Sequence, residues 1–178
     1  MVHLWHDIPS GKGAPRLVEA VVEIPKAGKV KYEIDLSLGV LRATRVLHGA
    51  VNYPANYGFI PRSLGEDGDA LDIVILGQED LVPGTIVTGR VIGVMPLVNR
   101  DLPDDKIIAV QVGDPEYENI KNLGDLPPHR MNELMRFFGD YKAVEGREVK
   151  VAAPLDQAEA IRVVGQALSS YEEKITAQ

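Results

Sequence analysis

Three aspartates lie close together in the segment EDGDALDIVI, where a turn leads into a run of β-forming residues. Asp67, Asp69 and Asp72 occupy positions i, i+2 and i+5 of this segment. Carboxylates held this close repel one another unless protons, basic side chains or metal ions compensate their charge. The segment therefore predicts one of three structures: a solvated turn, a calcium loop or a magnesium site.

The spacing of the residues around these aspartates separates the three alternatives in part. An EF-hand loop that begins at Asp67 requires glycine at its sixth position and glutamate at its twelfth, where this chain has Asp72 and Gln78. The EF-hand is therefore excluded. A solvated turn stays open, because Asp-Gly pairs are common in simple turns. A magnesium site needs few carboxylates and retains several waters, which a short acidic loop allows.

Further ionisable and phenolic side chains occur in three other segments. EIPKAGKVKYEID carries Glu23, Lys31 and Glu33, NRDLPDDK is a second acidic turn before a strand, and NYPANYGFIP contains Tyr53 and Tyr57. Each segment also has a structural interpretation, because charges protect strand edges and aromatic rings pack on a barrel. A neutral phenol can alternatively donate a hydrogen bond to an anion. Their conjunction favours chemistry based on carboxylates, metal ions and basic groups.

The composition and the absence of other motifs exclude several classes of protein. The 178 residues include no cysteine, so disulfides, zinc-thiolate sites and thiol nucleophiles are excluded. The net charge of −7 opposes general attraction to nucleic acids and anionic membranes. Neither a P-loop nor an H-E-x-x-H or G-x-S-x-G motif occurs. Without a secretory signal or an apolar span of about 20 residues, we expect a cytoplasmic protein outside the membrane.

Two kinds of periodicity divide the chain into a strand-rich part and a helical part. Short segments rich in Val and Ile predict strands at 17–24, 31–35, 40–47, 70–76, 85–98 and 106–112. Gly89 and Gly93 within one of them fit bends or bulges. The segment 126–146 predicts an amphipathic helix, a returning strand follows at 147–153, and a second helix begins near Asp156, which can cap it. We predict one α+β domain over residues 1–178, a β-barrel with two main helices.

Taken together, the motifs make the chain resemble the soluble family I inorganic pyrophosphatases, especially the prokaryotic ones. The similarity runs through VVEIP, KYEID, YPANYG, DGDALD, DDKIIAV and FFGDYK, and DGDALD has Ala70 where the family usually has proline. The resemblance implies a five-stranded OB-type barrel and hydrolysis of pyrophosphate to two phosphates by a metal-activated water. It also implies several Mg²⁺ ions per active site, with Mn²⁺ as an alternative, and a homo-oligomer, which is a hexamer in many prokaryotic relatives.

The resemblance assigns roles to individual residues. Asp69 is expected to act as the general base. The expected metal ligands are Asp67, Asp72, Asp104, Glu23 and Asn99, with Asp101 as a further candidate. The expected substrate-binding residues are Lys31, Arg45, Tyr53, Tyr57, Lys106, Tyr141 and Lys142. Among these, Lys31, Arg45 and Tyr57 are also expected to serve catalysis, while Glu33 is a further site residue. Basic groups of this kind stabilise the negative charge that builds on a leaving phosphate.

One position departs from the family pattern, and it keeps other functions open. Asn99 stands where the family usually has a metal-binding aspartate, so we expect weaker occupancy of one metal position unless Asp101 substitutes. The alternatives are a weakened relative that binds metal and phosphate without turnover, an OB-type nucleic-acid-binding module, and a structural metal-binding protein. The retained aspartates and the basic residues around them favour the enzyme, and the net charge disfavours the nucleic-acid-binding module.

Overall fold

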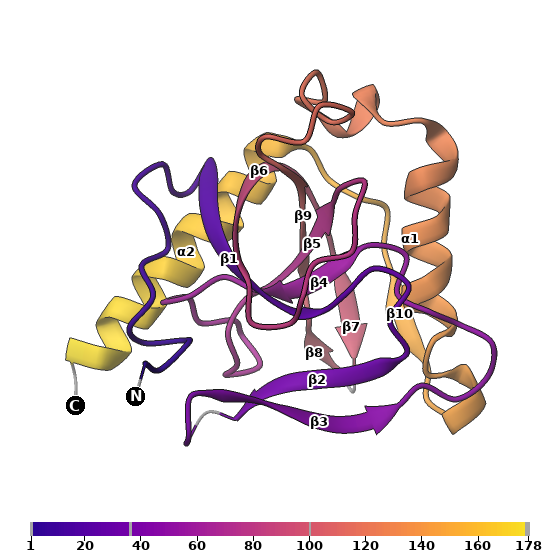
Figure 1. Ribbon diagram of the computed structural model, residues 1–178, viewed down its shortest axis with the longest axis horizontal. Helices are drawn as coiled ribbons and strands as arrows, with labels where there is room; N and C mark the ends of the chain where they lie inside the picture. Colours follow the sequence, from indigo (N-terminus) through magenta and orange to yellow (C-terminus); the bar gives the residue numbers. More distant parts are fainter. Residues whose placement is uncertain (1, 36, 100, 177–178) are drawn as a thin grey trace.

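A closed five-stranded barrel forms the centre of the computed structural model, which describes residues 2–35, 37–99 and 101–176 (Figure 1). Around the barrel the strand order is β1, β4, β5, β9, β6. In that order the strands span Leu17–Ile24, Asn56–Phe59, Asp72–Leu76, Lys106–Gln111 and Ile86–Met95. Strands β5 and β9 are parallel, and the other neighbouring pairs are antiparallel. The structure confirms the barrel that the sequence predicts.

Two smaller sheets lie outside the barrel. Strands β2 (Val30–Asp35) and β3 (Val40–Val46) form an antiparallel hairpin, which runs along the lower side of the molecule in Figure 1. Strands β7 (Leu97–Asn99), β8 (Leu102–Pro103) and β10 (Val149–Val151) form a three-stranded sheet. The strands predicted at 31–35, 40–47 and 147–153 are thus confirmed as strands. The first two belong to a hairpin beside the barrel.

Strand β4 is absent from the strands that the sequence predicts, although it is buried and central in the barrel. Its four residues include Asn56 and Gly58, which disfavour a strand on local propensity. The pairing with β1 and β5 overrides that propensity. Glycine is required at position 58, because a Cβ there would overlap the carbonyl oxygen of Val21 on β1.

The two glycines of β6 differ in their structural roles. The register between β6 and β9 shifts between Val91 and Gly93, so the bulge expected at Gly93 is confirmed. Gly89 instead pairs in regular register with Gln111. A side chain at position 93 would collide with Leu123, which belongs to the short helix η1 (Leu123–Asp125).

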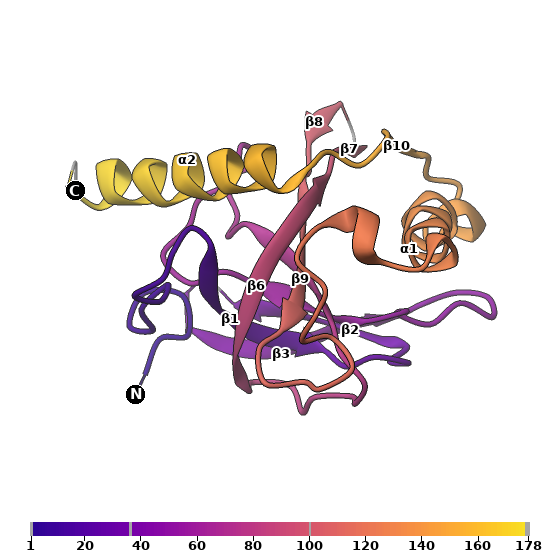
Figure 2. The same ribbon diagram turned by 90° about the horizontal axis from the view of Figure 1, so that it is seen from above.

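The two predicted helices pack on different sides of the barrel, as Figure 2 shows. Helix α1 (Pro128–Asp140) begins with proline and buries Leu134, Phe137 and Phe138. Helix α2 (Gln157–Thr176) lies along β6, and a carboxylate oxygen of Asp156 accepts a hydrogen bond of 3.0 Å from the Glu159 amide, which confirms the predicted cap. Within the described residues, no helix has the length and apolar character needed to cross a membrane.

The barrel strand β5 is buried on both faces, which explains its continuous apolar sequence. Ile73 and Ile75 belong to a core cluster that includes residues of α2, whereas Val74 and Leu76 belong to a cluster that includes residues of α1. Alternate side chains of a strand point to opposite faces. The strand that begins at Asp72 is therefore held rigidly from both sides, and this rigidity fixes where its first carboxylate lies.

Candidate active site

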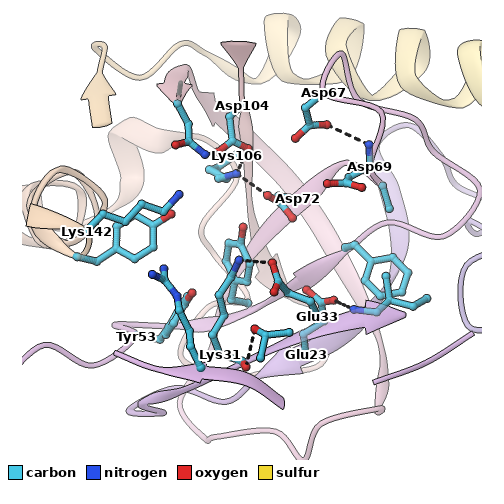
Figure 3. Close-up of a pocket in the computed structure, with 18 of the residues that line it drawn as sticks. Glu23, Lys31, Glu33, Tyr53, Asp67, Asp69, Asp72, Asp104, Lys106 and Lys142 are labelled. Carbon is cyan, nitrogen blue, oxygen red and sulfur yellow. Dashed lines mark hydrogen bonds and ion pairs between the residues drawn. The ribbon is translucent and has the colours of Figure 1, made fainter. Parts of the chain in front are cut away.

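A cavity of about 580 Å³ gathers side chains from the barrel, the β2–β3 hairpin and the segment after α1 (Figure 3). Apart from Asp101, every site residue expected from the sequence lines this cavity. They are Glu23, Lys31, Glu33, Arg45, Tyr53, Tyr57, Asp67, Asp69, Asp72, Asn99, Asp104, Lys106, Tyr141 and Lys142. Residues up to 119 positions apart in the chain, Glu23 and Lys142, thus share one site.

The aspartate loop, defined as residues 60–71 between β4 and β5, presents two of the carboxylates through a tight turn. The amide of Gly65 donates to the carbonyl of Asp69 over 2.7 Å, and Gly68 has a φ of +89°, which favours glycine. The amide of Asp69 also donates to the carboxylate of Asp67 over 3.1 Å. This turn fixes Asp67 and Asp69 beside Asp72, which begins β5.

Lys106 lies among the carboxylates and is only 2% exposed. The parallel register of β5 and β9 places it directly opposite Asp72, and its ammonium forms ion pairs with both Asp72 and Asp104. Burial alone would lower the pKa of Lys106, but the two carboxylates outweigh this effect and raise its pKa above the ordinary value. The buried ammonium therefore stays charged and compensates part of the acidic cluster.

Three further acids in the cavity resist ionisation. Burial, followed by repulsion from Asp72, raises the pKa of Glu23 to about 8, although the Ile34 amide donates to this carboxylate over 2.8 Å. Asp69 reaches solvent at the cavity mouth, yet partial desolvation and the nearby charges of Asp67 and Asp72 raise its pKa. The pKa of Asp67 is raised as well, chiefly by desolvation. Desolvation therefore disfavours the charged form of all three acids, and Glu23 is mostly protonated at neutral pH.

The acidic side has the donor chemistry of a magnesium site. Asp67, Asp72 and Asp104 offer hard carboxylate oxygens, which Mg²⁺ prefers. In the part of the chain that the structure describes, no three His, Asp or Glu side chains already stand in an arrangement that would hold a metal ion. Instead, Lys106 joins two of these carboxylates. After desolvation, repulsion from neighbouring carboxylates raises the pKa of Glu23, Asp67 and Asp69, and a bound cation would reduce this repulsion.

Lys31 and Lys142 lie on the other side of the cavity from Asp67 and Asp69 in Figure 3. Lys31 and Arg45 are cross-strand neighbours in the β2–β3 hairpin. Lys31 pairs with Glu33, and Arg45 pairs with Glu145 of the short helix η2 (Ala143–Glu145). These ion pairs hold the two basic groups at the cavity in the absence of an anionic ligand.

Lys142 completes this basic side from the segment that follows α1. It is buried, and its ammonium lies 5.0 Å from the centre of the Tyr141 ring. Burial, and then the nearby charge of Lys31, lower the pKa of Lys142 to about 8. An anion that bound between these groups would relieve the repulsion among them.

The three tyrosines of the site combine packing with neutral hydrogen-bond donors. The rings of Tyr53 and Tyr57 lie 5.3 Å apart, and Tyr53 lies 4.7 Å from Phe137 of α1. Burial is the main cause that raises the pKa of Tyr53, Tyr57 and Tyr141 above the ordinary value. Their phenols therefore stay protonated at neutral pH, where they can donate to an anion in the cavity.

Comparison with known proteins decides which family has this fold and this site. A family model described as inorganic pyrophosphatase matches residues 20–172. The chain belongs to the inorganic pyrophosphatase family. A soluble inorganic pyrophosphatase from Oryza sativa subsp. indica is 47% identical over 169 residues, which cover 95% of this chain and 79% of the rice protein. Soluble inorganic pyrophosphatase 5 from Arabidopsis thaliana is 46% identical over 173 residues, covering 97% of this chain and 80% of that protein.

Solved structures agree with this assignment. The inorganic pyrophosphatase from Thermus thermophilus superimposes on this chain with a TM-score of 0.92 and 37% identity, covering 96% of this chain and 99% of the other. The closed barrel with two helices is therefore the fold of the pyrophosphatase family. Plant and bacterial members are both similar to the chain, so the comparisons support the soluble pyrophosphatase family without singling out its prokaryotic members.

Sequence analysis missed several polar residues that line the cavity of this pyrophosphatase. These are Asp35, Arg42, Thr44 and Arg147. Asp35 could have been predicted from the sequence, because alternation along β2 places it on the same face as Lys31 and Glu33. The partner of Arg45, Glu145, was missed too, since 100 positions separate the two residues and no local pattern joins them.

The departure at Asn99 is visible in the pyrophosphatase site. Asn99 ends β7, lines the cavity and donates to the Asp104 carboxylate over a long 3.4 Å. Asp101 is exposed in the turn between β7 and β8, has a φ of +63° and does not line the cavity. Asp101 therefore does not place its carboxylate in the cavity, where it could replace the negative charge that Asn99 lacks.

Proposed function

We propose that this chain hydrolyses inorganic pyrophosphate to two orthophosphates, with Mg²⁺ as the metal in several positions and Mn²⁺ as an alternative. The observation that carries the proposal is the division of one cavity into two sides (Figure 3). The aspartates with Lys106 form the side suited to metal ions and a water nucleophile. Lys31, Arg45 and Lys142 form the side suited to the leaving phosphate. Membership in the pyrophosphatase family supports the same substrate.

The acidic side prepares the nucleophile. Asp67, Asp72 and Asp104, together with Glu23 and Asn99, would hold the metal ions. When bound, Mg²⁺ supplies acidification of water and neutralisation of charge on the electrophilic phosphate. Asp69 accepts the proton of the attacking water, and its raised pKa makes it a stronger base than an ordinary aspartate. The fixed turn of the aspartate loop keeps this carboxylate beside the metal ligands.

The basic side receives the leaving phosphate. Lys31 and Arg45 exchange their partners Glu33 and Glu145 for phosphate oxygens, and Lys142 adds a third positive charge. The charge on the leaving group grows during bond cleavage, so these groups bind the transition state more strongly than the substrate. Tyr53, Tyr57 and Tyr141 orient the phosphate through neutral hydroxyl donors.

We further infer an enzyme of prokaryotic type with one domain over residues 1–178, which works in the cytoplasm as a homo-oligomer, a hexamer by resemblance to the prokaryotic pyrophosphatases. The structural similarity to the Thermus thermophilus pyrophosphatase, with a TM-score of 0.92, supports the prokaryotic type. Sedimentation velocity measures the oligomer directly. A monomeric species at micromolar concentration would contradict the inferred assembly.

A substrate panel tests the proposed function against its rivals. We expect phosphate release from pyrophosphate with Mg²⁺, far slower release from para-nitrophenyl phosphate, and none with chelator. The net charge of −7 also predicts no binding of single-stranded DNA at physiological salt. Metal binding without turnover would favour the weakened relative, and tight metal-independent DNA binding would favour the nucleic-acid-binding module.

Asn99→Asp is expected to lower the Mg²⁺ concentration needed for half-maximal turnover. A carboxylate at this position would add a negative charge beside Asp104 and supply a stronger ligand than the amide oxygen. The measurement is pyrophosphate turnover across a Mg²⁺ titration, with Asp101→Asn as the matched control, because Asp101 is exposed outside the cavity. An unchanged Mg²⁺ requirement in Asn99→Asp would contradict the proposed ligand position.

Lys142 is expected to make substrate binding weaken as the pH rises through 8. Its pKa of about 8 means that the charged form dominates at pH 7 and the neutral form at pH 9, so KM should rise by about tenfold between them. Lys142→Arg stays charged and should remove most of this rise. KM is measured at each pH by varying the magnesium–pyrophosphate complex at a constant concentration of free Mg²⁺. Glu23 titrates in the same range, so only the difference between the two proteins reports on Lys142.

A further inference from the structure

The amino-terminal strap, defined as residues 3–7, lies against the aspartate loop and the last turns of α2. It contains Trp5, the sole tryptophan of the chain, which is only 5% exposed. The Trp5 ring stacks on His6 at 4.6 Å and lies 5.6 Å from the ring of Tyr171 in α2. The same apolar cluster includes Ala70 of the aspartate loop. The proposed catalytic roles leave this strap unexplained.

Hydrogen bonds tie the strap to the start of the aspartate loop. The indole N–H of Trp5 donates to the carbonyl of Ser63 over 2.8 Å. The amide of Arg62 donates to the carbonyl of Trp5 over 2.9 Å, and its guanidinium Nε donates to the carbonyl of His6 over 2.9 Å. Arg62 has a φ of +52°, a conformation that costs free energy for a residue other than glycine. External contacts therefore hold the loop in a backbone conformation that it would not favour alone.

The Ser63 side chain joins the start of the aspartate loop to its end, next to Asp72, through hydrogen bonds. This side chain is fully buried, and its hydroxyl donates to the carbonyl of Ile60 over 2.6 Å. The same hydroxyl oxygen accepts from the amide of Leu71 over 2.9 Å. Leu71 directly precedes Asp72, so Ser63 and Leu71 connect the Trp5 indole to the residue that begins β5. Leu64, which follows Ser63 in the loop, donates its amide hydrogen to the carbonyl of Ala167 in α2 over 2.9 Å.

We propose that Trp5 is a positioning residue for the metal-binding aspartates, which acts through Ser63. This inference rests on the proposed function, because it concerns the same Asp67 and Asp72. Those carboxylates lie in one cavity, five residues apart in the chain, where like charges repel one another. Ligand groups must be held within about 0.5 Å of their productive positions. The contacts of the strap keep the aspartate loop from moving apart from β5. They therefore lower the free energy needed to hold the carboxylates of Asp67 and Asp72 around a shared cation.

Trp5→Phe tests the proposal, because phenylalanine keeps an aromatic ring in the stack and removes the indole N–H. We expect the apparent Kd for Mn²⁺, measured by calorimetry without substrate, to rise on the order of threefold to tenfold, the range for one lost hydrogen bond. Turnover at saturating metal should be partly restored. Tyr171→Phe is the matched control: it loses the hydroxyl that contacts His6, yet keeps the Trp5–Ser63 bond. Its Kd for Mn²⁺ should match that of the wild type.

A folded Trp5→Phe protein with wild-type affinity for Mn²⁺ would overturn the proposal, as would an equal loss in Tyr171→Phe. If Trp5→Phe does not fold, the wild-type chain supplies the test through its single tryptophan. Mg²⁺ titration should change Trp5 emission with the midpoint that calorimetry gives for Mg²⁺ under the same conditions, and emission that stays constant would overturn the proposal. A wild-type protein that binds metal without hydrolysing pyrophosphate contradicts the proposed function alone, because the affinity and emission measurements do not use turnover.

Discussion

Replacing Asp69 by asparagine should lower kcat for pyrophosphate hydrolysis by roughly 10² to 10⁴-fold, the range for loss of a general base. The amide keeps the size and shape of the side chain and cannot accept the proton of the attacking water. Asp69 suits the role of base because partial desolvation and the charges of Asp67 and Asp72 raise its pKa while the loop turn fixes its position. Steady-state kinetics at saturating Mg²⁺ measure the effect.

The controls for Asp69→Asn separate catalysis from metal binding. Substrate-free affinity for Mg²⁺ should stay within about a factor of ten of the wild type, because Asp67, Asp72 and Asp104 remain. Glu66→Gln removes an exposed carboxylate from the same loop, outside the cavity lining, and should leave kcat near the wild-type value. A kcat for Asp69→Asn within a factor of about three of the wild type would remove Asp69 from the role of base.

Lys106→Met should have opposite effects on metal binding and on catalysis. The buried ammonium pairs with Asp72 and Asp104, so its removal leaves these carboxylates uncompensated and should lower the free energy of unfolding by about 3 kcal/mol without metal. The same change removes a positive charge that competes with metal ions, so affinity for Mg²⁺ should rise. Turnover should fall on the order of 10²-fold, because the charge no longer stabilises the transition state.

Two measurements test the predicted loss of stability and the predicted gain in affinity for Mg²⁺. Urea unfolding in chelator and in Mg²⁺ should show that metal restores much of the lost stability, and calorimetry should show the tighter binding of Mg²⁺. Lys150→Met is the matched control, since Lys150 is exposed on β10, and it should change neither quantity. Weaker Mg²⁺ binding in Lys106→Met would show that the ammonium supports the metal site and does not compete with it.

Local motifs predicted the chemistry of the site better than its architecture. DGDALD and DDKIIAV identify the acidic side because a few adjacent residues carry the necessary carboxylates. The parallel pairing of β5 and β9, which sets Lys106 opposite Asp72, follows from the closed barrel and has no signature in either segment. The same holds for β4, whose Asn56 and Gly58 oppose a strand locally and are tolerated only through the pairing with β1 and β5.

Contacts between distant segments were beyond prediction for a physical reason. The Arg45–Glu145 pair and the Trp5–Ser63 hydrogen bond join residues 100 and 58 positions apart. Such contacts depend on how the barrel brings the hairpin, the strap and the helices together, and periodicity reports only the local conformation. The resemblance to a family supplied the expected roles for the site residues. The structure shows how each of these groups is held in place and which neighbouring charges compensate it.

Metal-dependent hydrolysis is tested most directly by orthophosphate release from pyrophosphate by the purified protein across a Mg²⁺ titration, with a parallel titration of Mn²⁺. We expect no turnover in chelator, turnover that rises with free metal, and recovery of chelated protein when metal is returned. Undiminished turnover in chelator would contradict the metal-dependent mechanism. Absence of turnover at every Mg²⁺ and Mn²⁺ concentration, from folded protein that binds metal, would contradict the proposed activity.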